Sequence, residues 1–160
     1  MRHMRFCVAL GIGLLAACSP APAPNEGDTA AEAAVRAALE SYYQAFSDRD
    51  WDRFESHFWE GANLTTIWQP AGEDSPRVVA TSVTRFIADA PSGPGSREIF
   101  EERMTSLTLR VEGALAQAWA EYDARFGDPG DISEWSGVDA FSLLYHDGQW
   151  RITSLAYVPD

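Results

Sequence analysis

The sequence predicts one α+β domain in which three helices pack on one face of a strongly curved, mixed or antiparallel β-sheet. Two observations point to this fold class. Apolar residues in the first half recur at helical spacing, and the second half contains long segments in which apolar and polar residues alternate. Short turn signals separate these segments, as in an antiparallel meander. The chain has 160 residues, enough for one domain after processing segments are removed.

The first 17 residues have the composition of an export signal. Two arginines precede an uninterrupted apolar run over residues 6–15, and small residues then lead to Cys18. The run is too short to cross a bilayer as a stable helix. The segment Leu15–Cys18 resembles the lipobox of bacterial lipoproteins, which implies cleavage after residue 17 and attachment of lipid to the Cys18 thiol. We therefore expect a cell-envelope protein that contacts the bilayer through Cys18; an ordinary export signal is the alternative.

Residues 18–28 form the expected connection between this anchor and a domain over residues 29–160. Alternating proline and alanine after Ser19 disfavour a helix and favour an extended, solvated tether. Cys7 leaves with the signal and Cys18 carries the lipid, so the mature domain has no free thiol. A disulfide, a cysteine nucleophile and a thiolate metal site are therefore excluded.

The charge of the chain narrows the class of partner. The formal net charge is −12, loss of Arg2 and Arg5 with the signal brings it to −14, and the sequence contains no lysine. Nucleic-acid binding depends on basic side chains that neutralise phosphates, so we expect no nucleic-acid partner. For the same reason, the lipid and not a basic patch should make the membrane contact.

Three helices are expected before the long strands. The first begins near Thr29 and places apolar residues at helical spacing on one face, namely Val35, Leu39, Tyr42 and Phe46. A second, short helix over residues 51–58 is ended by Gly61. Ser82 is the expected N-cap of a third helix, which Pro91 stops.

Strands account for most of the remaining chain. Residues 64–69 are β-branched and aromatic, and residues 78–80 form a brief strand candidate. Longer strands are expected over 104–111, 114–126, 138–146 and 149–158. In the second of these, Ala116, Ala118, Ala120 and Tyr122 share one face. Asp147-Gly148 signals a tight hairpin, and we expect Trp150 and Ile152 to be buried in the strand that follows.

The order of these elements resembles the NTF2-like superfamily, a cone-shaped fold shared by ketosteroid isomerase and the SnoaL-like polyketide cyclases. The likeness spans roughly residues 29–157 and is most specific in the segments Gly137–Phe141 and Gly148–Ile152. These segments resemble the branch of small NTF2-like proteins described as lumazine-binding-like. Members of that branch often carry a His-Cys pair where this chain has Trp135-Ser136. The resemblance implies a pocket between the concave sheet and the helices.

Two aspartates are candidates for acid/base chemistry. Enzymes of the fold that this chain resembles transfer protons with an Asp or His base and a hydrogen-bond donor. Asp123 and Asp139 lie on strands expected to be neighbours. If both faced a low-dielectric pocket, their repulsion would raise the pKa of one carboxyl and create an acid/base pair. The alternative, which the residues alone favour, is that they pair with arginines such as Arg110 or Arg125, or face water.

Histidines offer one further candidate base. His57 lies beside the apolar stripe of the second helix, and its charge can change near neutral pH; a packed or solvated helix-end histidine is the alternative. His146 should lie on the surface. Two such distant histidines do not suggest a metal site, and the acids at 128, 131 and 134 lack EF-hand spacing. With no phosphate- or dinucleotide-binding fingerprint either, we expect no metal and no cofactor.

Aromatic residues suggest a ligand. Of six tryptophans and five tyrosines, Trp68, Trp119 and Tyr122 would suit the wall of a pocket for a planar molecule, and ordinary core or dimer interface is the alternative. These features favour a domain that binds a small apolar or aromatic molecule without transforming it. The alternatives are a cofactor-free isomerase, dehydratase or cyclase, and an interaction module that forms a homodimer through the sheet.

Overall fold

The computed structural model describes residues 26–69 and 72–160. Cys18, the export signal and most of the expected tether lie outside these residues. The helical elements are α1 (Glu26–Asp48), α2 (Trp51–Ser56), α3 (Val83–Asp89) and the 3-10 turn η1 (Ala90–Ser92). The strands are β1 (Phe58–Trp68), β2 (Arg77–Ser82), β3 (Ile99–Glu112), β4 (Leu115–Asp128), β5 (Asp131–His146) and β6 (Gln149–Pro159). Within the described residues, no helix is both long and apolar enough to cross a membrane.

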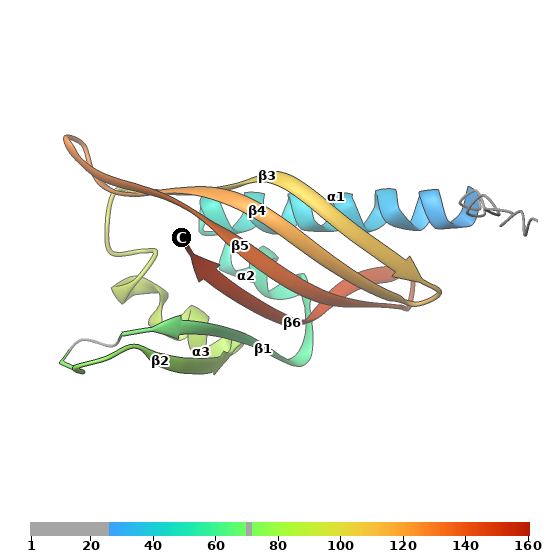
Figure 1. Ribbon diagram of the computed structural model, residues 1–160, viewed down its shortest axis with the longest axis horizontal. Coiled ribbons are helices and arrows are strands. Elements are labelled where there is room, and N and C mark those ends of the chain that lie inside the picture. The colour runs from blue at the N-terminus through green and yellow to red at the C-terminus, as the bar shows by residue number, and fades with distance from the viewer. Residues whose placement is uncertain (1–25, 70–71) are drawn as a thin grey trace, which may run out of the picture.

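The six strands form one mixed sheet that curves around α1, in the order β2-β1-β6-β5-β4-β3 (Figure 1). β1 and β6 pair in parallel, and the other neighbouring strands are antiparallel. Register shifts interrupt β1, β3 and β6, and such bulges bend a strand and increase its twist. The result is the α+β cone that the order of elements predicted, with helices on one face of a strongly curved sheet.

α1 lies along the concave face and supplies the apolar stripe that its spacing predicted. The stripe is buried at all four expected positions, Val35, Leu39, Tyr42 and Phe46. The helix begins at Glu26, slightly before the expected start. Near its other end, the Ser47 hydroxyl donates to the Glu102 carbonyl and accepts from the Glu102 N–H, each over 2.8 Å. These bonds satisfy backbone groups on the free edge of β3 and fix α1 against that strand.

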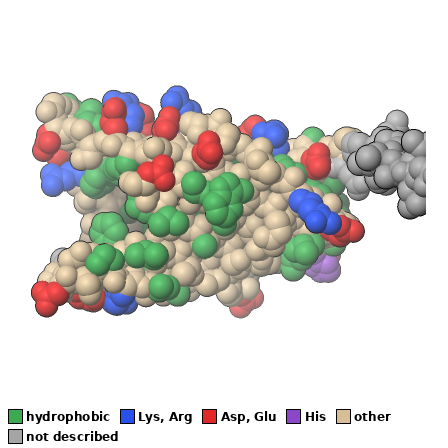
Figure 2. All heavy atoms as spheres, in the orientation of Figure 1, with side chains coloured by type: hydrophobic (Ala, Val, Ile, Leu, Met, Phe, Trp, Pro, Cys, Tyr) green, Lys and Arg blue, Asp and Glu red, His purple; other side chains and the backbone are tan. Residues whose placement is uncertain are grey.

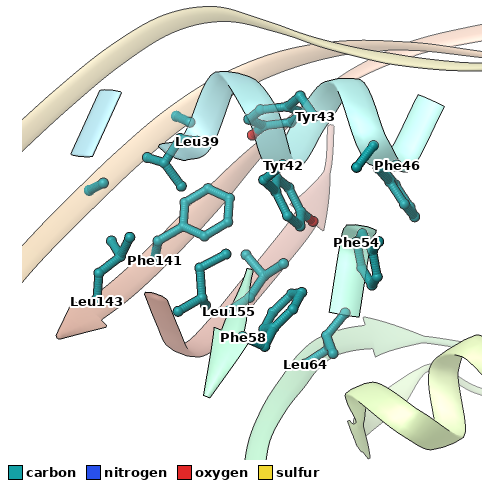
Figure 3. Packing of buried hydrophobic residues seen from close by; sticks show 14 of the residues in the cluster. Leu39, Tyr42, Tyr43, Phe46, Phe54, Phe58, Leu64, Phe141, Leu143 and Leu155 are labelled. Carbon is teal, nitrogen blue, oxygen red and sulfur yellow. The ribbon is translucent and has the colours of Figure 1, made fainter. Parts of the chain in front are cut away.

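An aromatic core fills the cone between the helices and the sheet (Figure 3). Between ring centroids, Tyr42 lies 5.3 Å from Phe141 and 5.4 Å from Phe54. The Tyr42 and Phe141 rings meet edge to face, one of the favourable arrangements for aromatic pairs. Leu143 and Leu155 complete the packing from the sheet. This part of the cone is therefore occupied by side chains.

The second helix is shorter than its apolar spacing predicted. α2 ends at Ser56, and the chain enters β1 at Phe58 because β6 pairs with it there. The Ile152 N–H donates to the His57 carbonyl over 2.8 Å. Gly61 therefore lies inside β1, at a φ of 81° beside the register shift, and does not end a helix. Here pairing between distant segments has overridden a local helical pattern.

Three expected turns and caps had different outcomes. Ser82 caps α3 as predicted, by accepting a hydrogen bond from the Arg85 N–H. Asp147-Gly148 forms the tight turn between β5 and β6, both residues with positive φ. By contrast, β4 and β5 are joined by residues 129–130 alone, where a loop over 127–136 was expected. The acids at 128, 131 and 134 therefore lie on paired strands.

The last strand is buried less completely than predicted. Ile152 is fully buried as expected, but Trp150 is only half-buried against the core. Trp150 lies just after the β5–β6 turn, where the sheet ends, and its ring contacts Tyr145 with centroids 5.3 Å apart. The expectation of full burial was wrong for this residue because it covers the end of the core.

Candidate ligand-binding site

Side chains of β4 and β5 alternate between the concave face, which α1 covers, and the open outer face. The β4 residues predicted to share one face all lie on the concave side and are buried: Ala116, Ala118, Ala120 and Tyr122. On β5, Asp139 and Phe141 are buried on the same side. The register places Asp139 opposite Ala120 on β4 and Tyr157 on β6. Asp139 therefore projects into the interior beneath α1.

Asp139 is the only charged side chain that is fully buried in the described part of the chain, with 2% of its surface exposed. The Tyr43 hydroxyl on α1 donates to its Oδ2 over 2.6 Å. Burial raises the pKa of Asp139 to about 7, and the hydrogen bond from Tyr43 opposes that rise. The carboxyl consequently changes its charge near neutral pH.

Glu102 on β3 is the acidic neighbour of Asp139. Burial raises the pKa of the Glu102 carboxyl well above its usual range, and the charge of Asp139 raises it further. Two carboxyls that repel each other in a low-dielectric setting share a proton and titrate as a pair. Glu102 is only partly covered, and it lines a groove at the surface. The carboxyl that interacts with Asp139 is therefore Glu102 and not Asp123.

Asp123 is not brought near Asp139. The register places Asp123 opposite Ser136 on β5 and Arg103 on β3, on the outer face of the sheet, where it is exposed. Asp139 is on the opposite face of the same sheet. The hypothesis that these two aspartates repel each other in one pocket is therefore wrong, because Asp123 projects from the outer face of the sheet and Asp139 from the concave face.

A bulge in β3 explains why Glu102 was missed. Leu107, Leu109 and Val111 alternate toward the concave face, and continuing that alternation would turn Glu102 outward. The register shift between residues 104 and 106 adds one residue and reverses the orientation of the preceding segment. The sequence contains no glycine or proline there to signal the bulge.

Aromatic side chains surround the two carboxyls. Tyr122 is buried, and Trp135 lies beside it on the same face of the sheet. A Cβ at Gly137 would collide with the Tyr122 hydroxyl, so the glycine allows Tyr122 to lie across β5. Burial, with the charges of Glu102 and Asp139, raises the pKa of Tyr157 to about 12, and burial likewise raises the pKa values of Tyr43 and Tyr122. The two carboxyls and the aromatic residues around them lie towards the open end of the cone, and we call them the mouth cluster: Tyr43, Glu102, Tyr122, Trp135, Asp139 and Tyr157.

Trp68 and Trp119 are the other two predicted ligand contacts. Only Trp68 lies on the same face of the sheet as the mouth cluster. Alternation along β1 puts Trp68 on the same face as buried Leu64, and β1 pairs Thr66 with Tyr157. Trp68 is 60% exposed at the end of its strand. Trp119 is 57% exposed on the outer face of β4 and cannot line the same site as Tyr122.

The surface beside the mouth cluster is hollowed in two places. An open groove of about 500 Å³ runs between α1 and the edge of β3. Its lining comes from both elements and from β4, and includes Tyr43, Glu102, Met104, Asp123 and Arg125. Figure 2 shows a second hollow at the end of the molecule, between the β4–β5 hairpin and the strands β1 and β2. We refer to this open end of the cone as the mouth.

His57 has a separate environment. Its Nε2 lies 3.3 Å from the Ser41 hydroxyl, which also accepts a hydrogen bond from Arg53. Burial, and then the charge of Arg53, lower the pKa of His57, so the ring is neutral at neutral pH. His57 does not line the groove at the mouth cluster. His146 is exposed beside Asp147, and no cluster of three potential metal ligands occurs among the described residues.

The comparison with known families decides the assignment. A profile described as "SnoaL-like domain" matches residues 35–157, which includes the second half of α1, the sheet except the last two residues of β6, and the mouth cluster. The chain belongs to this family. The SnoaL-like domain thus lies within the NTF2-like superfamily that the residues resembled. No sequence among the curated proteins matches the chain.

Solved structures share the fold of this SnoaL-like domain. A protein of unknown function from Mycobacterium tuberculosis has a TM-score of 0.67 and 17% identity, over 82% of this chain and 73% of the other. An NTF-2-like protein of unknown function from Silicibacter pomeroyi gives 0.59 and 23%, over 82% and 98%. A proposed scytalone dehydratase from Novosphingobium aromaticivorans gives 0.66 and 11%, over 82% and 85%. At these identities the likeness concerns the fold alone.

The SnoaL-like domain therefore combines three chemical properties at one place. Asp139 holds or releases a proton near neutral pH, and burial raises the pKa of Glu102 beside it. The tyrosine hydroxyls keep their protons and can donate hydrogen bonds. The surrounding rings offer flat apolar surface for contact with a ligand.

Proposed function

We propose that this SnoaL-like domain binds a small, partly aromatic or apolar molecule at the mouth of the cone. The observation that carries the proposal is Asp139, a carboxyl buried among aromatic side chains and held by Tyr43 over 2.6 Å. Burying a carboxyl costs stability that an apolar residue would not. Sites that bind small molecules typically join apolar walls to a few polar groups, and ionisable groups with shifted pKa values cluster at them.

The two carboxyls also limit the chemistry of the ligand. No basic side chain contributes to the pKa of Asp139 or of Glu102. An anionic group placed beside them would be repelled, whereas a hydroxyl, amine or amide could donate to Asp139 or Glu102. We therefore infer a ligand with a flat apolar part and a hydrogen-bond donor.

A thermal-shift screen of the mature chain carrying Cys18→Ser tests this function. A library of small aromatic molecules with donor groups is the probe, because a ligand that binds only the native state raises the melting temperature. Trp68→Ala and Asp139→Asn should weaken the binding of any hit, measured by calorimetry. The matched control Trp119→Ala, on the outer face, should leave it unchanged. Equal affinity in all three variants would contradict the proposal.

Lipid attachment at Cys18, and with it the location in the cell envelope, is the second part of the proposal. It is supported by the apolar run and the small residues that precede Cys18. Cys18→Ser should abolish incorporation of a labelled fatty acid, and the control Cys7→Ser should retain it. Labelling that persists without Cys18 would show that the anchor assignment is wrong.

A cofactor-free acid/base enzyme is the second candidate function. The pKa of Asp139, about 7, favours it, because a general base works best when its pKa lies near the working pH. The fold is shared with the proposed scytalone dehydratase named above. Asp139→Asn should then lower turnover of an enolisable carbonyl compound by about 10²–10⁴ while binding survives. The pH–rate profile should follow the coupled carboxyls as a pair.

The outer face of the sheet supports a third possibility, a homodimer. Trp119 is 57% exposed there. Large exposed aromatic side chains are enriched in protein interfaces. Sedimentation of the wild type and of Trp119→Glu should then give a dimer and a monomer respectively; a wild-type monomer would exclude this pairing.

A further inference from the structure

The narrow end of the cone, opposite the mouth, carries exposed apolar side chains. α1 begins at this end, and the β3–β4 and β5–β6 turns lie beside it (Figure 1). Leu115, Leu144 and Tyr145 are each between 43% and 47% exposed. Trp59 and Trp150 lie next to them and are half-buried. We call these five residues the turn-end surface.

Internal contacts hold these residues in two groups, one on each face of the sheet at this end. Leu115 on β4 lies directly opposite Leu144 on β5. The Trp59 indole N–H donates to the Leu144 carbonyl over 3.3 Å. The ring of Tyr145 packs against the ring of Trp150. Leucine side chains beside tryptophan and tyrosine rings form the mixed apolar and polar surface that is favoured at the boundary between lipid headgroups and water.

The two turns at this end are less acidic than the chain as a whole. Residues 110–115 and 144–151 contain two arginines and two acids, so they are neutral when His146 is neutral, although the chain carries −12. Arg110 pairs with Glu112, and the Arg151 guanidinium stacks over the Trp59 ring at 4.9 Å. The two turns therefore add no net negative charge at this end, where the start of α1 contributes Glu26, Asp28 and Glu32.

The connection to Cys18 keeps the start of α1 close to the membrane. Glu26, the first residue of α1, follows Cys18 by eight positions, and eight residues span at most about 29 Å. α1 has 23 residues and is therefore about 35 Å long. Tyr43 and the mouth cluster lie near its far end.

We propose that the turn-end surface docks on the headgroup layer of the membrane that holds Cys18, with the mouth facing the aqueous compartment. The inference rests on the proposed lipid attachment. It adds that the domain has a fixed orientation, in which a water-borne ligand enters the mouth without crossing the lipid surface.

Quenching of tryptophan fluorescence by brominated lipid tests this orientation. The mature chain is coupled through the Cys18 thiol to a maleimide lipid in phosphatidylcholine vesicles, with and without brominated acyl chains. Chemical coupling makes the test independent of whether cells lipidate Cys18, which the labelling experiment above decides. We expect quenching in the wild type and most of it to disappear in the double variant Trp59→Phe/Trp150→Phe.

The matched control is Trp68→Phe/Trp119→Phe, which removes two tryptophans away from this end and should keep the quenching. Leu144→Glu in the wild-type background should abolish the quenching at an unchanged melting temperature. Because Leu144 is exposed, this variant separates docking from a loss of folding. Absence of quenching in the coupled wild type, or its loss only in the control, would overturn the proposal.

Discussion

Asp139 and Phe141 occupy consecutive inward positions on β5, and the two residues serve different purposes. Both are buried, with 2% and 1% of their surfaces exposed. Phe141 meets the rings of Tyr42 and Tyr43 edge to face, as part of the aromatic core. Asp139 meets the hydroxyl end of Tyr43 with a carboxyl whose pKa burial raises to about 7. Two consecutive inward positions of β5 thus hold a ring that packs the core and, nearer the open end of the cone, a carboxyl that can titrate near neutral pH.

The largest expected effect concerns the packing residue. Phe141→Ala removes a ring from a filled core and should lower the free energy of unfolding by about 3–5 kcal/mol, measured by urea denaturation. Trp119→Ala deletes a larger but mostly exposed ring and should cost less than about 1 kcal/mol. A loss below about 1 kcal/mol for Phe141→Ala would mean that the core is not packed as described.

Asp139 should make stability fall as pH rises. Its pKa is raised in the native state, so between about pH 4 and pH 7 the native protein keeps a proton that the unfolded chain has lost. The free energy of unfolding should therefore decrease by up to about 1.4 kcal/mol per pH unit across this window. Asp139→Asn should flatten this slope and, above pH 7, make the protein more stable than the wild type. An unchanged slope in the variant would show that Asp139 titrates normally.

A smaller effect is expected for Tyr43→Phe, which removes the hydroxyl that donates to Asp139. The buried carboxyl then loses its partner, and stability at neutral pH should fall by about 1–3 kcal/mol. The pKa of Asp139 should also rise further, since the lost bond favoured the charged form. Tyr145→Phe, at an exposed tyrosine, is the control and should change neither quantity. An equal loss of stability in Tyr43→Phe and Tyr145→Phe would show that the hydrogen bond from Tyr43 to Asp139 does not stabilise the protein.

Much of the fold could be predicted from the sequence, because alternation and turn chemistry are local properties. The buried face of β4 follows from its small alternating residues, and the β5–β6 turn follows from Asp147-Gly148. The site could be predicted only in part. A turn at residues 129–130 sets the register that puts Ala120, and not Asp123, opposite Asp139. That turn was expected to be longer, so the relative orientation of the two aspartates could not be derived.

Glu102 and Trp119 illustrate what local patterns do not contain. Glu102 faces inward only because a bulge in β3 reverses the alternation, and nothing in the sequence marks that bulge. Trp119 was a reasonable pocket residue by composition, but its strand position places it on the outer face. Both outcomes depend on how strands pair across the sheet, which is a property of the whole fold.

The central claim, that the mouth is where a ligand binds, can be tested most directly with the six tryptophan indole N–H signals in a ¹H–¹⁵N NMR spectrum. Trp135 and Trp68 report on the mouth, Trp119 on the outer face, and Trp59 on the narrow end. A hit from the thermal-shift library should move the Trp135 and Trp68 signals and leave the Trp119 and Trp59 signals in place. A hit that moves only the Trp119 or Trp59 signals would contradict the claim.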